Sequence, residues 1–270
     1  MPARRTLAVA LTLILGASCA TAPETAEVGA PGEEAAEVVR VLDGDSFVVQ
    51  IGGRQAEVRL IGINAPERDE CFGDEARDQL DRLLTAGTVT LEKGTVEDTD
   101  RFGRLLRYVR VDGDLANSAM LSSGHAFVLD TDHGQAAAFA ALEDDAFAQG
   151  RGLWASDACG PRVQRSVLIA SVEADPPGPD TEGEFVELVN TGAASVDMSG
   201  WIIRDASSVH RFEFPVGTSL EPGGSVVVFT GCTARSAGLA WCADGPVWNN
   251  GGDTVVVQTP EGTVVDRLRY

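Results

Sequence analysis

Apolar and polar residues alternate with a period of two through the first part of the chain. Residues 38–51, VVRVLDGDSFVVQI, form two β-rich runs around Asp43-Gly44, which is a hairpin signal. The segment 55–63, QAEVRLIGI, continues as a third strand, and TVTLEKG and RLLRYVRVDG add two more. The pattern predicts a small sheet built from hairpins.

A helical period replaces the alternation at three places. Apolar residues recur at helical spacing after Gly73, and Gly87 supplies a stop. Residues 115–121 predict a short helix, and a last helix has one apolar face. The apolar positions are Ala76, Leu80, Leu83 and Leu84 in the first helix and Phe139, Leu142 and Ala146 in the last. Residues 37–160 are therefore predicted to form an α+β domain, an OB-type β-barrel with packed helices.

The pattern from 166 to 270 is all-β. Short apolar strands such as FVELVNTG, GSVVVFTG and GDTVVVQTP are separated by Gly, Pro, Asn or Asp, without a helical period. The stretch CGPRVQRS marks a junction ahead of them, and no repeat connects the two halves. Residues 166–270 are therefore predicted to form a second domain, a β-sandwich.

The first 36 residues are expected to lie outside both domains. Residues 1–19 have two arginines, an apolar run and then small residues, which is the layout of a secretory signal and too short for a membrane span. Residues 20–36 are rich in Ala, Pro, Gly and Glu and predict a disordered acidic tether. In LGASC, Cys19 ends a stretch similar to a bacterial lipobox. The chain is therefore expected to be exported. Either the signal segment is cleaved in the ordinary way nearby, or Cys19 is lipidated after cleavage.

Net charge and cysteines narrow the choice of function. The net charge is −20 and is spread over the whole chain, which argues against polyanion binding by a broad basic surface. A nucleic-acid function would therefore need a local, metal-assisted site. The five cysteines include no C-x-x-C pair, which argues against a zinc cluster. Export to an oxidising compartment favours disulfides over reduced thiols.

Three polar clusters follow one another within the predicted barrel. In the strand RLIGI, alternation places Arg59 on the same face as Ile61 and Ile63, where an unpaired cation is costly. Each cluster also has an ordinary explanation, as a hairpin turn, a loop with a wall salt bridge, or a solvated connection. The clusters are Asp43-Gly44-Asp45, then Arg59 with Asn64 and Glu67, then residues 98–104, DTDRFGR.

Together these clusters contain the groups that phosphodiester hydrolysis requires. Asp45 and Asn64 offer hard oxygen ligands for Ca²⁺. Arg59 and Arg104 offer guanidinium groups that match phosphate oxygens, and Glu67 offers a base for water. The sequence thus predicts a cation and two arginines where charge builds on phosphorus.

Residues 37–158 resemble the staphylococcal nuclease (thermonuclease) family. The blocks VLDGDS, RLIGINAPE, DRFGR, ANSAMLSSGHA and GRGLW match the family's signatures in order and spacing. The resemblance implies hydrolysis of DNA and RNA by water, with the 5′ oxygen leaving. It implies these roles: catalytic Arg59, Glu67 and Arg104; calcium ligands Asp45, Asn64 and the Ala65 carbonyl; supporting acids Asp43 and Asp100; and substrate contacts Arg101 and Phe102.

Two departures from the family bear on this site. Asn64 stands where the founding member has Asp, which keeps an oxygen ligand, removes a negative charge and predicts weaker calcium affinity. Phe102 stands where a Tyr is usual and loses a hydroxyl near a substrate phosphate. On this reading, one disulfide joins Cys71 to Cys159 and fastens the loop after Glu67, and a local one joins Cys232 to Cys242.

The second half resembles the lamin-tail domain, an immunoglobulin-like sandwich. The matching blocks include EGEFVELVNTG, VDMSGWIIRD, LEPGGSVVVF and VWNNGGDTVVV. The resemblance implies an adhesive or targeting role toward protein, membrane or nucleic acid. The whole chain is predicted to be an exported, calcium-dependent nuclease; the alternative is a nuclease-like binding or surface scaffold protein with weak or lost catalysis.

Overall fold

The computed structural model describes residues 33–129, 131–207, 209–232 and 238–270. The predicted signal segment, Cys19 and most of the predicted tether therefore lie outside the described residues. Strand β1 begins at Glu33, so the expectation that residues 33–36 belong to a disordered tether is wrong. These residues pair with β5, with Glu33 opposite Glu92. The pairing gives hydrogen-bond partners to the backbone groups of both strands.

Five strands close into a barrel in the order β3-β2-β1-β5-β6, and a parallel pairing of β3 with β6 completes it. Val58 lies opposite Leu105 in that pairing. This is the OB-type barrel that the sequence predicts. The strands are β1 (Glu33–Val41), β2 (Ser46–Ile51), β3 (Arg54–Leu60), β5 (Val89–Glu92) and β6 (Leu105–Val111), with short β4 (Ile63–Asn64), β7 (Asp114–Leu115) and β8 (Phe127–Val128).

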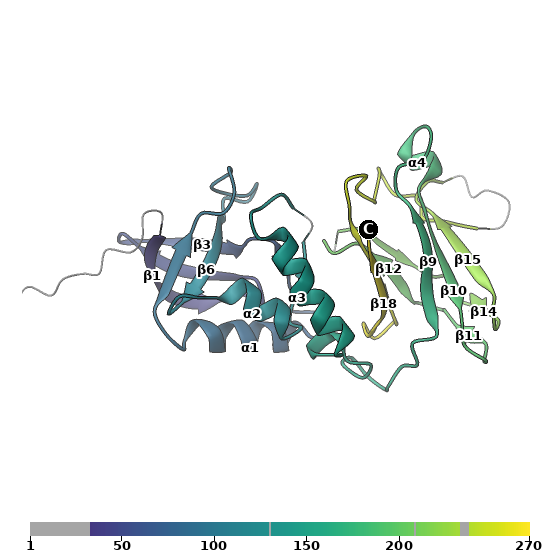
Figure 1. Cartoon of the computed structure of the whole chain (residues 1–270), viewed down its shortest axis with the longest axis horizontal. Coiled ribbons are helices and arrows are strands. Elements are labelled where there is room, and N and C mark those ends of the chain that lie inside the picture. Colours follow the sequence, from purple (N-terminus) through teal and green to yellow (C-terminus); the bar gives the residue numbers. More distant parts are fainter. Residues whose placement is uncertain (1–32, 130, 208, 233–237) are drawn as a thin grey trace, which may run out of the picture.

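Helices lie beside the barrel at the positions that the apolar spacing indicates (Figure 1). They are α1 (Gly73–Leu84), α2 (Ala116–Ser122), α3 (Ala136–Ala148) and the 3-10 turn η1 (Gly152–Trp154). Helix α1 buries Ala76, Leu80 and Leu84, and Asp74 and Glu75 in its first turn suit the positive end of the helix dipole. None of the helices in the described part of the chain is long and apolar enough to cross a membrane.

The second domain is a sandwich of two four-stranded sheets, ordered β16-β15-β10-β9 and β13-β12-β17-β18. Trp201 and Trp248 are buried between the sheets, as expected for core residues. Its elements are β9 (Val167–Glu173), α4 (Asp180–Gly183), β10 (Phe185–Asn190), β11 (Val196–Asp197), β12 (Ile202–Arg204), β13 (Arg211–Glu213), β14 (Ser219–Leu220), β15 (Ser225–Phe229), β16 (Leu239–Ala240), β17 (Thr254–Gln258) and β18 (Val264–Arg269).

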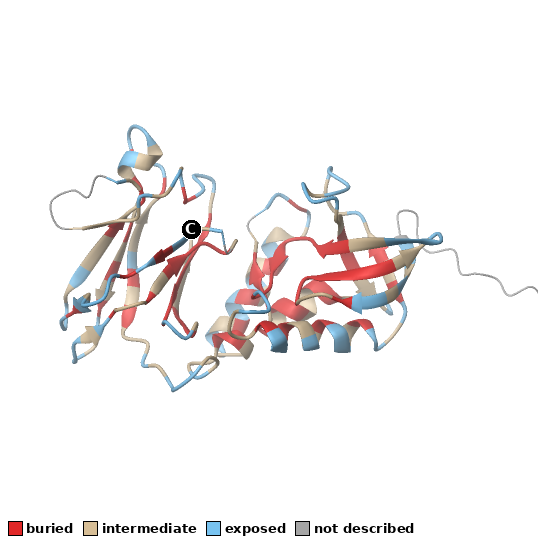
Figure 2. Cartoon of the chain, turned by 180° about the vertical axis from the view of Figure 1, so that it is seen from behind, coloured by how far each residue is buried: buried red, intermediate tan, exposed pale blue. Residues whose placement is uncertain are grey.

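The two domains pack directly against each other. Figure 1 shows α3 and β18 on facing sides of the junction, and Figure 2 shows buried residues reaching this side of both domains. Trp154 is fully buried here and meets the edge of Phe127 at 5.1 Å between ring centroids. Val256 and Val264 of the sandwich belong to the same apolar cluster. The chain is therefore one packed unit, with an apolar seam between barrel and sandwich.

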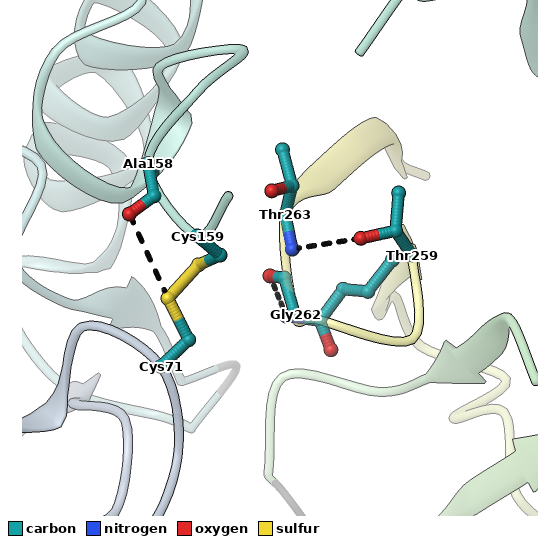
Figure 3. Close-up of a disulfide and its surroundings, with 7 residues drawn as sticks. Cys71, Ala158, Cys159, Thr259, Gly262 and Thr263 are labelled. Carbon is teal, nitrogen blue, oxygen red and sulfur yellow. Dashed lines mark hydrogen bonds between the residues drawn. A yellow bond between two sulfur atoms is a disulfide. The ribbon is translucent and has the colours of Figure 1, made fainter. Parts of the chain in front are cut away.

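The predicted disulfide between Cys71 and Cys159 is present at this seam (Figure 3). It connects the loop before α1 to the end of the barrel domain, and the two Cα atoms are 5.7 Å apart. The turn around Gly262 in the sandwich lies against it, because a Cβ at Gly262 would come 3.1 Å from the Cβ of Cys71. The second predicted disulfide, between Cys232 and Cys242, is also present.

A buried ion-pair cluster also holds the seam. Glu143 on α3 has no exposed surface, accepts a hydrogen bond from the Val128 backbone N–H at 2.8 Å, and pairs with Arg267 and Arg269 of β18. Neighbouring Asp144 pairs with the same arginines, but its side chain is 60% exposed. Burial distinguishes the two carboxylates, because water can replace the partners of an exposed charge but cannot reach a buried one.

We expect Glu143→Ala to lower the free energy of unfolding by about 3–5 kcal/mol, because it leaves two arginines without their buried counter-charge. Asp144→Ala is the matched control and is expected to cost less than about 1 kcal/mol. Denaturant unfolding followed by tryptophan fluorescence measures both. Equal effects of the two substitutions would show that the seam does not depend on the buried charge.

Candidate nuclease site

The hairpin between β1 and β2 places the first acidic residues of the site. Asp43 accepts hydrogen bonds from the backbone N–H of Asp45 at 2.9 Å and from the hydroxyl of Ser46 at 2.7 Å. Gly44 permits this turn to approach the rest of the domain, because a Cβ there would lie 2.6 Å from the Cβ of Ala65. The turn therefore needs glycine to bring Asp45 next to the segment after β4.

Asp45 is buried and has two partners. Its Oδ2 atom accepts a hydrogen bond from the backbone N–H of Ala65 at 2.7 Å and lies 3.1 Å from Nη2 of Arg59. Burial raises the pKa of Asp45 from 3.8 to about 7, and the charge of Asp43 adds to this, while the Arg59 guanidinium opposes it. Burial prevails because the carboxylate has lost most of its water.

Arg59 is held by oxygen atoms on several sides. Its Nη1 atom donates to the carbonyls of Leu60 at 2.8 Å and Ile63 at 2.7 Å, and Nη2 donates to the side-chain oxygen of Asn64 at 3.0 Å. The anion nearest to this buried cation is thus Asp45. Arg59 organises the site within the barrel wall, and its contact with a phosphate stays a prediction.

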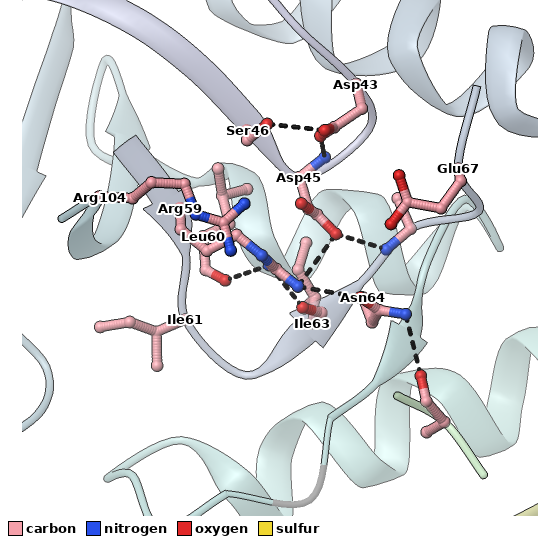
Figure 4. Close-up of polar contacts among 12 residues, drawn as sticks. Asp43, Asp45, Ser46, Arg59, Leu60, Ile61, Ile63, Asn64, Glu67 and Arg104 are labelled. Carbon is pink, nitrogen blue, oxygen red and sulfur yellow. Dashed lines mark hydrogen bonds and ion pairs between the residues drawn. The ribbon is translucent and has the colours of Figure 1, made fainter. Parts of the chain in front are cut away.

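Arg104 comes from the loop before β6 and is positioned by Asp100. The Asp100 carboxylate accepts hydrogen bonds from Nε of Arg104 at 2.7 Å, from its backbone N–H at 3.0 Å, and from that of Phe102 at 2.9 Å. Burial alone would raise the pKa of Asp100, but these hydrogen bonds lower it overall. Figure 4 shows the guanidinium of Arg104 directed toward that of Arg59. Asp100 therefore holds Arg104 in place, and its role as a supporting acid of catalysis stays a prediction.

Glu67 lies in the exposed loop after β4, and Figure 4 shows its carboxylate on the Asp45 side of that loop. Partial burial of the carboxyl raises its pKa, and the negative charges of Asp43 and Glu70 add to the effect. Glu70 also fixes the loop, because its carboxylate accepts a hydrogen bond from the backbone N–H of Glu67 at 3.1 Å. A solvent-facing carboxylate with a raised pKa suits a general base.

The two predicted substrate contacts form an exposed stack beside Arg104. The guanidinium carbon of Arg101 lies 4.8 Å from the centroid of the Phe102 ring, and that of Arg104 lies 5.5 Å from it. Phe102 is 69% exposed. Two cations around an exposed aromatic ring are suited to a nucleotide.

The candidate calcium ligands lie next to one another on the hairpin turn, on β4 and directly after β4. Within the described part of the chain, no three His, Cys, Asp or Glu side chains form a metal cluster. The candidate set is instead one buried carboxylate, one amide oxygen and one backbone carbonyl, from Asp45, Asn64 and Ala65. Hard oxygen donors of this kind fit Ca²⁺, and a bound cation would favour the ionised form of Asp45.

Sequence reasoning missed two contributors to the site. Glu70 braces Glu67, and its place three residues later in PERDE was an available signal. The second is the backbone carbonyl of Ala206 in the sandwich, which accepts a hydrogen bond from the Asn64 side-chain amide at 2.9 Å. No local sequence pattern indicates this hydrogen bond, because Asn64 and Ala206 are 142 positions apart.

Comparison with known proteins agrees with this geometry. Residues 57–156 match the family model described as staphylococcal nuclease homologue, and residues 161–270 match that of the lamin tail domain. Protein ParB of Escherichia coli is 36% identical over 129 residues, which cover 44% of this chain and 71% of that protein. A protein named uncharacterized endonuclease, from E. coli O157:H7, is 37% identical over 122 residues, 45% of this chain and 76% of its own length.

The thermonuclease of Staphylococcus hyicus is 35% identical over 98 residues, which are 34% of this chain and 57% of that enzyme. The fold and the matches define an OB-fold nuclease domain joined to an immunoglobulin-like lamin-tail domain. The chain belongs to the staphylococcal nuclease family and is a nuclease, that is, a phosphodiesterase.

The raised pKa of Asp45 predicts how the free energy of unfolding depends on pH when a chelator keeps the site free of metal. Between about pH 4 and pH 7 the unfolded state releases the proton that folded Asp45 retains, so the free energy of unfolding should fall as the pH rises. Below pH 4 and above pH 7 this group contributes no slope. Asp45→Asn should remove this part of the pH dependence, because the asparagine amide has no proton to release in this range. Denaturant titrations of both proteins between about pH 4 and pH 7 measure the free energy of unfolding. The same pH dependence in both proteins would contradict a raised pKa of Asp45.

Proposed function

We propose that the chain is a calcium-dependent nuclease that hydrolyses phosphodiester bonds of DNA, RNA or both. The observation that carries the proposal is the grouping of Asp45, Arg59 and Glu67 around the β4 segment, with Arg104 directed toward Arg59 (Figure 4). The named endonuclease and thermonuclease relatives support a nucleic-acid substrate.

Glu67 starts the proposed reaction by accepting a proton from a water molecule. The water oxygen forms a bond to phosphorus, the bond from phosphorus to the 5′ oxygen breaks, and that oxygen takes up a proton from solvent water. The products are a 3′-phosphate and a 5′-hydroxyl. Arg104 and Arg59 stabilise the negative charge that grows on the phosphoryl oxygens. Calcium held by Asp45, Asn64 and the Ala65 carbonyl would supply further positive charge there.

Export is a separate part of the proposal. The signal-like residues 1–19 support it, and so do two disulfides, which persist in oxidising compartments. The protein would then be secreted or, if Cys19 is lipidated, anchored to the outer face of the membrane. A calcium site with few charges suits that location, since extracellular sites of about 10⁻⁴–10⁻³ M suffice. An adhesive role of the sandwich would use surface away from the barrel.

We expect Glu67→Ala and Arg104→Ala each to lower kcat by at least about 10²-fold, because one removes the base and the other a charge-stabilising group. Glu221→Ala and Arg162→Ala are the matched controls, since they remove the same charges at exposed positions outside the barrel. Steady-state hydrolysis of single-stranded DNA, with the melting temperature checked, measures the effect. A Glu67 or Arg104 variant with unaltered kcat and a normal melting temperature would remove that residue from the mechanism.

We further expect EGTA to abolish hydrolysis and added calcium to restore it, with half-maximal activity at about 10⁻⁴–10⁻³ M. Asp45→Asn should raise the calcium concentration required, because it removes the buried carboxylate from the ligand set. Activity titrations of both proteins test this. Full activity in EGTA would contradict the proposed calcium dependence.

A further inference from the structure

The sandwich reaches into the nuclease site at one short segment, Arg204–Ala206, which begins at the end of β12 and which we call the bracing segment. It contacts the site in two places. One contact is with a predicted calcium ligand, and the other is with the loop that carries the predicted base. Both come from a domain that has so far been given only a targeting role.

The first contact fixes the side chain of Asn64. Its Nδ2 atom donates to the carbonyl of Ala206 at 2.9 Å, while its Oδ1 atom accepts from Arg59 at 3.0 Å. The terminal torsion of an asparagine is otherwise broad, so a partner on the nitrogen also fixes where the oxygen points. Without the sandwich, this nitrogen would lose the hydrogen bond that sets the amide.

This contact also gives a reason for asparagine at position 64. An aspartate has no N–H to donate, and its carboxylate would face the Ala206 carbonyl in a place where only 7% of residue 64 is exposed. Two acceptors facing each other out of water are costly. The amide therefore matches a barrel that has a sandwich packed on it.

The second contact braces the loop of Glu67. The Arg204 side chain is 1% exposed, and its guanidinium carbon lies 4.7 Å from the centroid of the Phe127 ring. Phe127 pairs with Asn64 between β8 and β4. Nη1 of Arg204 is 3.7 Å from Oε2 of Glu70, the atom that accepts the hydrogen bond from the Glu67 backbone N–H. Arg211 binds the other oxygen of Glu70.

The bracing segment is itself rigidly held. Arg204 lies opposite Val256 in the pairing of β12 with β17, and Val256 is buried in the seam. Nε of Arg204 donates to the carbonyl of Asp205 at 3.0 Å, and the Asp205 carboxylate binds Ser207 and His210. A segment fixed in this way can impose its geometry on the loop it touches.

We propose that the lamin-tail domain is a working part of the nuclease, in which Ala206 and Arg204 position Asn64 and the Glu67 loop for calcium binding and hydrolysis. The proposal rests on the calcium-dependent function proposed above. Arg204 and Ala206 are positioning residues, since they act through Asn64 and Glu70. Groups that orient the ligands of a metal site typically change affinity or activity by about 10–100-fold when they are removed.

Asn64→Asp in the full chain separates this proposal from a simple charge effect. Added charge alone would tighten calcium binding. If the Ala206 contact positions residue 64, the variant should bind calcium at least about tenfold more weakly than the original protein. Its calcium-free melting temperature should fall as well. Calorimetric calcium titration and thermal unfolding in EGTA measure the two, and calcium affinity equal to or tighter than the original overturns the role of Ala206.

Arg204→Met tests the second contact, because methionine keeps an apolar stem over Phe127 but removes the charge near Glu70. We expect calcium affinity and kcat to fall about 10–100-fold, with partial rescue in Arg204→Lys. Arg267→Met is the matched control, since Arg267 also stacks on aromatic rings in the seam but contacts Glu143 and Asp144 instead of the site loop. It should lower the melting temperature without changing calcium affinity.

The same titrations distinguish failure of the two proposals. An original protein that neither binds calcium nor hydrolyses nucleic acid would refute the proposed function itself. An active, calcium-binding original protein whose Arg204→Met variant stays within about twofold of it in both calcium affinity and kcat would refute only the bracing role of Arg204. Equal losses of calcium affinity in Arg204→Met and Arg267→Met would also refute it, because the loss would then follow from the loosened seam.

Discussion

The buried ion pair between Asp45 and Arg59 is the interaction on which the rest of the site depends. Both side chains are nearly removed from water, and such a pair is tolerated only when the remaining donors and acceptors are satisfied. The carbonyls of Leu60 and Ile63 and the amide of Ala65 supply those partners. These backbone groups hold the hairpin turn, the end of β3 and the segment after β4 in a fixed relation.

That fixed relation explains why the second domain affects the site. Asn64 lies between Arg59 and the sandwich, so its amide transmits the position of Ala206 to the same ion pair. Ala206 is held in the apolar cluster of the seam, together with Trp154 and Phe127. Barrel, seam and site therefore form a continuous series of contacts across the two domains.

Much of the fold follows from the sequence because its determinants are local. The hairpin at Asp43-Gly44, the apolar spacing of α1 and the alternation of the sandwich strands each lie within a few residues of one another. The support of Arg104 by Asp100 is equally local. The contacts of Glu143 with Arg269 and of Asn64 with Ala206 were not foreseen, because they join residues more than a hundred positions apart and depend on how two finished domains pack. Glu33 was misjudged because its strand is stabilised by pairing with β5 rather than by its own apolar pattern.

The acidic character of the chain is compatible with a polyanionic substrate because of where its cations lie. With a net charge of −20, the protein as a whole gives little long-range attraction to a nucleic acid. Binding would therefore rest on short-range contacts, for which Arg101 and Arg104 flank the exposed ring of Phe102. Stacking and directed hydrogen bonds are screened by salt less than diffuse attraction is, so the site depends on geometry more than on total charge. Rigid support of Asn64 and Glu67 by the bracing segment matters most in such a site. The site must position a substrate that the net charge of the protein does not attract.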